Sequence, residues 1–414
     1  MIPYDLPMAL RSLPAVVLLL LILCASNLPG GEPPFVEYPA DLKPYLATLH
    51  QRPGSLSFQG ESGPELERWR RKARGRLKDL LGLKLMEQTL KEFEPRVELS
   101  PAQERTDHLR FSGTIETEPG IRIPFWLLKP KSIGSRPHPL AICSHGHDRI
   151  GRHTYAGVWR NEAHRQQGTN RGGPIGIQAV RHGFIALVPA TRGLAEEIEL
   201  PDLKGRHGKR PCRAQLIHAL MAGRTAVGER VWDLQRLLDW GLTQPDVDPS
   251  KVLMMGNSGG GVLTVHTAAI DPRISIAVPS CSFTSFRSRE GYIFHCDCCL
   301  IPRVQVELGD FSDIGGLISP RPLLAINGHT DGLHHRPAVE RAVARVRRIY
   351  RAAGATSQFR HLWGAAGHQF YPDLMWPLIQ QWLNHEEGRF HRDPAIPRPA
   401  YLSQRPRALD RGGK

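Results

Sequence analysis

The sequence predicts an α/β protein with a mainly parallel central sheet covered by helices on both faces. Between residues 108 and 385, short apolar runs alternate with segments whose apolar residues recur at helical spacing, and this alternation is typical of parallel sheets. The chain has 414 residues, of which 41% are hydrophobic and 23% charged. This composition allows a large core and excludes a wholly disordered chain or a multi-span membrane protein.

The first 26 residues have the layout of a secretory signal peptide, because Arg11 precedes an apolar run from Leu13 to Cys24 and two small residues follow. The run is too short for a spanning helix, which needs about 20 apolar residues. We therefore expect a secreted or periplasmic protein with no stable membrane span after signal removal. Lipid or membrane anchoring is less favoured, since the bulky Leu23 precedes Cys24.

Residues 27–105 are expected to form an N-terminal extension. Its first part, up to residue 60, is rich in Pro and Gly. From Pro64 to Leu83, apolar residues recur at helical spacing, and Gly82 is a plausible helix stop. The pattern predicts one amphipathic helix ahead of the main domain.

Residues 106–388 are expected to form the main domain. Two runs, 108–117 and 121–130, predict an antiparallel hairpin, and the all-apolar LAICS within 139–148 predicts a buried central strand. Further strands are predicted at 183–193, 274–283, 320–331 and 359–368, a strand and turn at 251–261, and helices at 228–242, 262–270, 336–354 and 373–385. The insertions 149–178 and 194–223 lack a strong strand pattern, and such insertions commonly build the substrate side of an enzyme.

The net charge of +14 raises the question of nucleic-acid binding. Residues 389–414 hold seven Arg or Lys against two Asp, a net +5, in a proline-rich stretch expected to be a disordered tail. Other basic residues are spread over helix faces such as 67–79. Because no nucleic-acid-binding motif is found, we expect no nucleic-acid partner and associate the charge with anionic surfaces or polymers.

Six cysteines lie outside the predicted signal peptide, and in an exported protein an even number permits disulfides. Three of them, Cys296, Cys298 and Cys299, form the cluster HCDCC with His295, and Cys281 lies nearby in sequence. The two-residue gap of zinc-binding cysteine pairs is absent. We therefore favour a local disulfide or buried thiols over a metal site, and expect no metal and no cofactor.

The stretch LMMGNSGGG, residues 253–261, contains the strongest chemical signal. Ser258 follows an apolar strand, precedes a helical pattern, and has glycines two residues before and after it. A nucleophile elbow needs this arrangement, because the serine adopts a strained backbone conformation while strand and helix pass closely. Ser258 is therefore the candidate nucleophile.

A serine hydroxyl needs a base to take its proton and a carboxylate to orient that base. Asp331 directly follows one predicted strand and His368 follows the last one, in the order expected for this kind of elbow. Less favoured alternatives are His329, His334, His335 and His361 for the base, and Asp310, Asp313 and Glu340 for the acid.

Ester or amide cleavage also needs backbone N–H groups that bind the negatively charged oxygen of the transition state. Gly259, the residue after the nucleophile, is one candidate. The other should come from the loop SHGHD (144–148), where His147 is favoured and Gly146 is next. His145 and His147 alone are a poor metal-ligand pair, because no acidic ligand accompanies them.

From about residue 65 to 385 the chain resembles the α/β-hydrolase superfamily, within it the dienelactone-hydrolase and acetyl-xylan-esterase-like branch. The matching motifs are SHGHD (144–148), GFIALVPATRG (183–193), GRTAVGERVWDLQRLLDW (223–240), GNSGGG (256–261), DPRISIAVPSC (271–281), SPRPLLAINGHTD (319–331) and GHQF (367–370). The resemblance implies an α/β-hydrolase fold, a triad of Ser258, Asp331 and His368, and hydrolysis of carboxylic esters. Two features depart from it: dienelactone hydrolases use a cysteine nucleophile, and GLHH (332–335) replaces the aromatic residue and proline that many relatives have after the acid.

The sequence thus favours an exported serine esterase that acts on a small-molecule or carbohydrate ester, with acetylated polysaccharide suggested by analogy. A serine peptidase on the same fold is less favoured, because the chain has no room for a large gating domain. A third interpretation is a catalytically silent protein that binds a cell-surface polymer. The complete set of triad residues argues against this interpretation.

Overall fold

The computed structural model describes residues 39–49, 53–131, 136–207, 210–289 and 291–385, which belong to one compact unit. The predicted signal peptide and the predicted tail lie outside the described residues. Within the described ranges, no helix is both long and apolar enough to cross a membrane.

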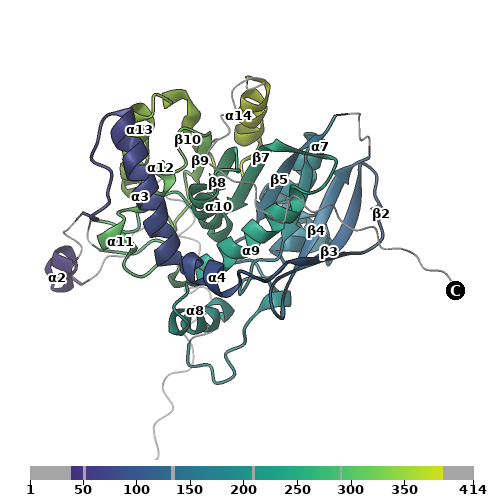
Figure 1. The fold of residues 1–414 in the computed structure, drawn as a ribbon, viewed down its shortest axis with the longest axis horizontal. Helices are drawn as coiled ribbons and strands as arrows, with labels where there is room; N and C mark the ends of the chain where they lie inside the picture. Colours follow the sequence, from purple (N-terminus) through teal and green to yellow (C-terminus); the bar gives the residue numbers. More distant parts are fainter. Residues whose placement is uncertain (1–38, 50–52, 132–135, 208–209, 290, 386–414) are drawn as a thin grey trace, which may run out of the picture. The chain divides into compact units, whose positions relative to one another are not determined.

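The centre of the fold is a ten-stranded sheet with the order β1-β3-β4-β6-β5-β7-β8-β9-β10, and β2 pairs with β3 (Figure 1). The strands β6, β5, β7, β8, β9 and β10 pair with one another in parallel. The strands β1, β2, β3 and β4 pair antiparallel, and so does β4 with β6. The strands are β1 (Arg96–Leu99), β2 (Gln103–Glu104), β3 (His108–Glu118), β4 (Ile121–Pro130), β5 (His138–Ser144), β6 (Ile185–Pro189), β7 (Val247–Asn257), β8 (Ile276–Ser280), β9 (Leu323–Gly328) and β10 (Phe359–Gly364). The predicted hairpin and the central position of LAICS are confirmed.

The helices include every one that the sequence predicted. They are α2 (Leu42–Leu49), α3 (Gly63–Leu81), α4 (Leu83–Thr89), α5 (Gly151–Tyr155), α6 (Glu162–Asn170), α7 (Ile175–Arg181), α8 (Pro211–Met221), α9 (Ala226–Gly241), α10 (Gly259–Ile270), α11 (Val304–Glu307), α12 (Phe311–Gly316), α13 (Arg336–Ala352) and α14 (Pro372–His385). Short 3₁₀ helices are η1 (Glu196–Ile198), η2 (Asp297–Cys299) and η3 (Thr356–Gln358). The two insertions contain α5, α6, part of α7, η1 and α8.

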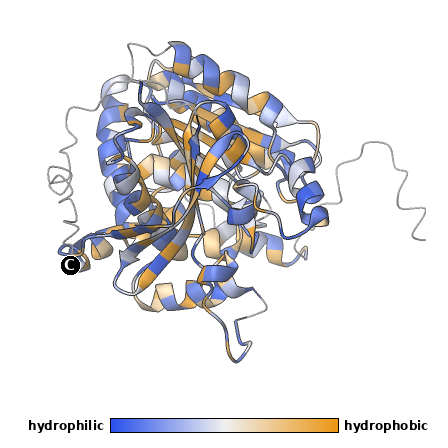
Figure 2. Ribbon diagram, turned by 90° about the vertical axis from the view of Figure 1, so that its right-hand side faces the viewer, coloured by the Kyte–Doolittle hydropathy of each residue, from blue (hydrophilic) through white to orange (hydrophobic). Residues whose placement is uncertain are grey.

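The sheet separates two hydrophobic cores, and successive strand residues point alternately into them. In β5, Ile142 belongs to the core that includes α3, α9, α10 and α13, whereas Ala141 and Cys143 belong to the core that includes α7 and α14. Figure 2 shows many hydrophobic residues, in orange, in the central strands, and helices on either side that carry both hydrophilic and hydrophobic residues. This burial on both faces explains why the central strands are continuous apolar runs.

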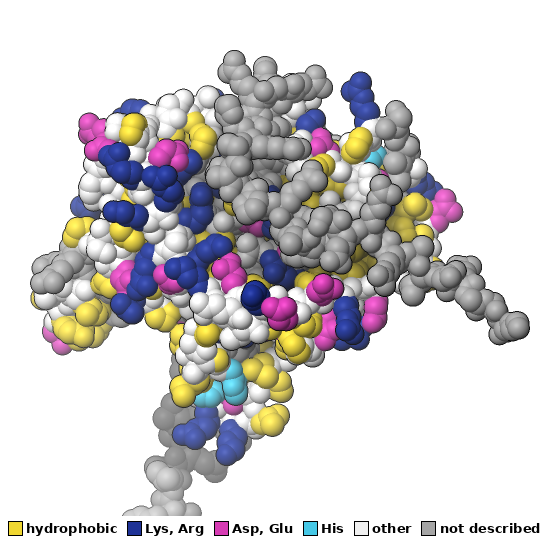
Figure 3. All heavy atoms as spheres, viewed as in Figure 1, with side chains coloured by type: hydrophobic (Ala, Val, Ile, Leu, Met, Phe, Trp, Pro, Cys, Tyr) yellow, Lys and Arg dark blue, Asp and Glu magenta, His cyan; other side chains and the backbone are white. Residues whose placement is uncertain are grey.

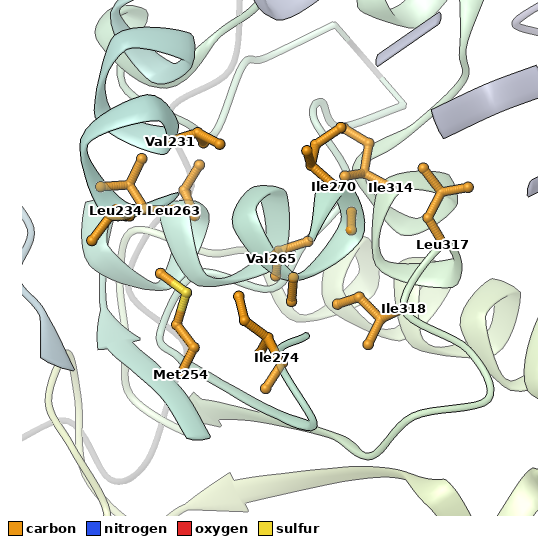
Figure 4. Close-up of a cluster of buried hydrophobic side chains, with 14 of the residues drawn as sticks. Val231, Leu234, Met254, Leu263, Val265, Ile270, Ile274, Ile314, Leu317 and Ile318 are labelled. Carbon is orange, nitrogen blue, oxygen red and sulfur yellow. The ribbon is translucent and has the colours of Figure 1, made fainter. Parts of the chain in front are cut away.

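Helix α10 is buried along its whole length and is the helix that follows the Ser258 turn. Figure 4 shows Leu263 and Val265 of α10 among side chains of β7, α9 and α12. The surrounding helices and sheet thus hold the start of α10 firmly, which fixes the turn before it.

The stretch from 39 to 105, expected as an extension, contributes β1, β2 and α3 to the same compact unit. Helix α3 begins at a capping box formed by Ser62 and Glu65. It ends at Gly82, whose φ of 81° is a left-handed conformation that favours glycine. The predicted amphipathic helix and its stop are confirmed.

Lys and Arg side chains gather over α3 and α13, with acidic side chains interspersed (Figure 3). Several of these basic side chains are anchored, as Arg345 is by an ion pair of 2.7 Å to the buried Asp313. The basic helix faces predicted from the sequence are therefore present, and some of their basic side chains form ion pairs with carboxylates.

We expect acid to destabilise the fold through His266 of α10. Burial lowers the pKa of His266 to about 4, from 6.5, so between these pH values the unfolded chain binds a proton that the folded chain does not. The contribution of His266 to the free energy of unfolding is retained above pH 6.5. It falls by on the order of 3 kcal/mol as the pH approaches 4. Denaturant titrations at pH 7 and 4.5 measure the loss.

The His266→Leu variant should lose less stability on acidification than the wild type, because leucine does not titrate. Thr267→Val is the matched control, since Thr267 is buried beside it and has no titratable group. Equal losses in the wild type and in His266→Leu would show that His266 is not responsible.

Candidate active site

Ser258 lies in the tight turn between β7 and α10. Its φ of 58° and ψ of −126° are a conformation that residues other than glycine rarely adopt. The Ser258 N–H donates to the carbonyl of Ser280 at 3.0 Å, which ties the turn to the end of β8. The strained turn expected for a nucleophile elbow is therefore present.

The glycines around Ser258 are required by close contacts. A Cβ on Gly260 would overlap the Ser144 carbonyl oxygen, and a Cβ on Gly256 would overlap the backbone of Gly260. A Cβ on Gly261 would overlap the side chain of Ser282. Gly260 thus lets the turn lie directly against β5, Gly261 lets it lie against the chain after β8, and Gly256 lets the end of β7 pass close to the start of α10.

Asp331 and His368 meet beyond the ends of β9 and β10. His368 Nδ1 lies 2.8 Å from Asp331 Oδ2, and Leu333 N–H donates to Asp331 Oδ1 at 3.0 Å. Burial opposes ionisation of Asp331, yet its hydrogen bond with His368 and the nearby His334 outweigh burial and lower its pKa. A carboxylate here fixes the imidazole with Nδ1 protonated and leaves Nε2 free to accept a proton.

The end of β8 holds the His368 loop beside the Ser258 turn. The Ser280 hydroxyl donates to the Gln369 carbonyl at 2.8 Å, and the Ser280 carbonyl accepts from the Ser258 N–H. The Cys281 thiol lies 3.4 Å from the Gln369 carbonyl. The three predicted triad residues therefore follow the carboxyl ends of β7, β9 and β10, and the end of β8, which lies between β7 and β9, links the Ser258 turn to the His368 loop.

The predicted oxyanion loop packs against the turn. A Cβ on Gly146 would lie 2.7 Å from Gly259 N and 3.1 Å from Ser258 Cβ, and a Cβ on Gly259 would lie 3.2 Å from His147 Nδ1. Gly259 is the first residue of α10, where N–H groups have no partner inside the helix. Gly146, His147 and Gly259, predicted from separate motifs, are thus brought together beside Ser258.

His145, buried in the same loop, holds the loop's shape. Its Nε2 accepts from Thr191 N–H at 2.9 Å, and its Nδ1 donates to the Gly146 carbonyl at 2.9 Å. Burial lowers the pKa of His145 to about 4, which keeps the ring neutral and both bonds intact near neutral pH. With both nitrogens engaged, His145 is a structural residue.

Several of the less favoured alternatives for the catalytic base and acid are engaged in other contacts. Asp310 and Asp313 form the capping box of α12, and His361 lies 3.2 Å from the Asn327 side chain. His334 is the nearest rival, at 3.6 Å from Asp331, but burial lowers its pKa to about 3. A base with so low a pKa accepts a proton poorly at neutral pH, which favours His368.

One arrangement was missed by sequence reasoning. The six described cysteines are free thiols, so the structure has no disulfide within the described residues. Nitrogen and sulfur atoms of His147, Cys212, Cys296 and Cys298 lie within 4.8 Å of one another. Cys212 is over 80 residues from HCDCC in sequence, so local spacing could not reveal this cluster.

Comparisons with known proteins agree with the fold. No protein-family model matches the chain. Over 157 residues it is 29% identical to the "Putative hydrolase YtaP" of Bacillus subtilis (strain 168). This match covers 36% of the chain and 50% of that protein, so the chain matches about half the length of this relative.

Solved structures match over most of the chain. A "putative acetyl xylan esterase" of Bacteroides fragilis has a TM-score of 0.64 at 15% identity, covering 83% of this chain and 95% of that one. A glucuronoyl esterase from Solibacter usitatus has a TM-score of 0.57 at 16% identity, covering 79% and 96%. Methylesterase BT1017 has a TM-score of 0.58 at 19% identity, covering 85% and 69%.

The chain therefore has the α/β-hydrolase fold, as the sequence predicted. The three solved structures that it resembles are named as an acetyl xylan esterase, a methylesterase and a glucuronoyl esterase.

Proposed function

We propose that this protein is a serine hydrolase of carboxylic esters. The observation that carries the proposal is the 2.8 Å contact of His368 Nδ1 with the buried Asp331 carboxylate, in a loop tied to the strained turn of Ser258. The names of the structures with the same fold support ester chemistry over peptide cleavage.

In the proposed mechanism, Ser258 Oγ attacks the ester carbonyl while His368 Nε2 takes the hydroxyl proton. Asp331 keeps the ring oriented and stabilises the imidazolium that forms. The N–H groups of Gly259 and His147, with Gly146 as the alternative donor, stabilise the oxyanion. The protonated His368 then gives its proton to the leaving alcohol, and a water molecule activated by the same histidine hydrolyses the acyl-enzyme.

We propose an acetylated polysaccharide as substrate and the cell exterior as the place of action. Support comes from the printed names of the similar structures and from the signal-like residues 1–26. N-terminal sequencing of the protein from its native host tests cleavage of the leader.

A substrate panel tests the function. Purified protein should hydrolyse 4-nitrophenyl acetate, release acetate from acetylated xylan, and act more slowly on octanoyl esters. A 4-nitroanilide with the same acyl group measures amide cleavage in parallel. Turnover of the anilide with equal kcat/KM would favour a peptidase, and absence of turnover of every ester would contradict the proposal.

A further inference from the structure

Three segments that are distant in sequence bring soft metal ligands together beside the site. His147 comes from the predicted oxyanion loop, Cys212 from the first turn of α8, and Cys296 and Cys298 flank Asp297 at η2. Helix α8 packs against η2 and belongs to the second insertion, seen in Figure 1 next to α9. The cluster thus joins the insertion to the site loop.

The spacing of the four atoms fits a single small ion. His147 Nε2 lies 3.2 Å from Cys298 Sγ, Cys298 Sγ lies 3.9 Å from Cys296 Sγ, and all pairs are within 4.8 Å. With zinc–sulfur bonds of about 2.3 Å, tetrahedral ligands are about 3.8 Å apart. The Cys296–Cys298 sulfur distance also exceeds the roughly 2.05 Å of a disulfide.

Two arginines lie beside the sulfur atoms, and positive charge favours deprotonated cysteines. One carboxylate is also near, because Asp297 Oδ1 lies 3.0 Å from Cys296 Sγ, and that carboxylate is paired with Arg213. The Arg230 guanidinium is 1% exposed and lies 3.4 Å from Cys298 Sγ, and Arg210 lies 3.4 Å from Cys296 Sγ. Among the described residues, no carboxylate forms an ion pair with Arg230. A buried cation needs a negative partner, and thiolates at the cluster supply one. Cys212, at the start of α8, also benefits from the positive end of the helix dipole.

We infer that His147, Cys212, Cys296 and Cys298 bind one zinc ion. Three thiolates and an imidazole form a closed tetrahedral set, which is typical of structural zinc. Cys212 and Cys298 are buried, Cys296 is half-buried and His147 is exposed, so the ion lies near the surface on the histidine side. This inference replaces the disulfide or thiol interpretation of HCDCC.

The ion also bears on the site loop, and this consequence rests on the proposed function. Because His147 Nδ1 faces Gly259, a metal on Nε2 fixes the ring and, through it, the loop that supplies an oxyanion donor. The zinc is thus a positioning element, and it takes no part in the reaction steps.

Metal content tests the inference directly. Full-length protein carrying no polyhistidine tag should contain about one zinc per chain by mass spectrometry of metals. Cys212→Ser and Cys298→Ser should lower this content at least about fivefold. Cys299→Ala is the matched control and should retain zinc, because Cys299 is buried in the same turn but is not one of the four ligands.

Cobalt exchange reports the ligands even where a serine variant fails to fold. Co²⁺ in the wild type should show thiolate charge-transfer bands and the visible bands of a tetrahedral ion, and His147→Ala should keep the former and alter the latter. A wild type that binds neither zinc nor cobalt, or a Cys298→Ser variant with wild-type zinc, would overturn the inference. Zinc in a protein without esterase activity would overturn the proposed function alone.

Discussion

Replacing Ser258 by alanine should lower kcat for acetyl esters by about 10³-fold or more, because the acyl-enzyme can no longer form. Substrate binding should change little, since the substitution removes one oxygen atom from a half-buried position. Folding should be retained, because Ser258 contributes its N–H group to the contact with Ser280 and alanine keeps that group. Initial rates with 4-nitrophenyl acetate measure the effect.

Ser282→Ala is the matched control. Ser282 is buried next to Gly261, and its hydroxyl has no hydrogen-bond partner among the described residues. Its removal should leave kcat within about threefold of the wild type. A Ser258→Ala enzyme with activity like that of the control would mean that the nucleophile is a different residue.

Asp331→Asn should lower kcat by about 10³- to 10⁴-fold, although the side chain keeps its size. The carboxylate holds His368 with Nδ1 protonated, and an amide can offer its N–H to Nδ1 instead, which places the proton on Nε2. That nitrogen then cannot accept the Ser258 proton. Progress curves at several substrate concentrations should show the loss in kcat rather than in KM.

Asp313→Asn separates catalysis from stability. Asp313 is fully buried and pairs with Arg345, so its loss should lower the melting temperature while kcat of the folded fraction stays near the wild-type value. If instead Asp313→Asn abolished activity in folded protein and Asp331→Asn did not, the acid would have been assigned wrongly.

The fold was predictable where the pattern of apolar residues agrees with the residues that end helices and strands. The all-apolar strand at 140–143 and the helix stop at Gly82 both follow from local rules, and the structure has both. The membership of β1 and β2 in the sheet was not predictable, because these strands are short and exposed at the edge. Their position depends on pairing with β3, which a local pattern does not contain.

The candidate site was predictable because each residue follows a strand of a parallel sheet. Ser258, Asp331 and His368 lie at strand ends, and such ends meet at one edge. No comparable rule predicts the cluster of His147 with Cys212, Cys296 and Cys298, because its members come from a loop, a helix start and a 3₁₀ turn. Only the packing of α8 against η2 brings Cys212 to the other ligands.

Covalent labelling tests the central claim most directly. Wild-type protein treated with a fluorophosphonate should gain one label per chain, lose its esterase activity in parallel, and carry the label on the peptide that contains Ser258. Full esterase activity without labelling, or a label on a different residue that accounts for the inactivation, would contradict the assignment of Ser258 as the nucleophile.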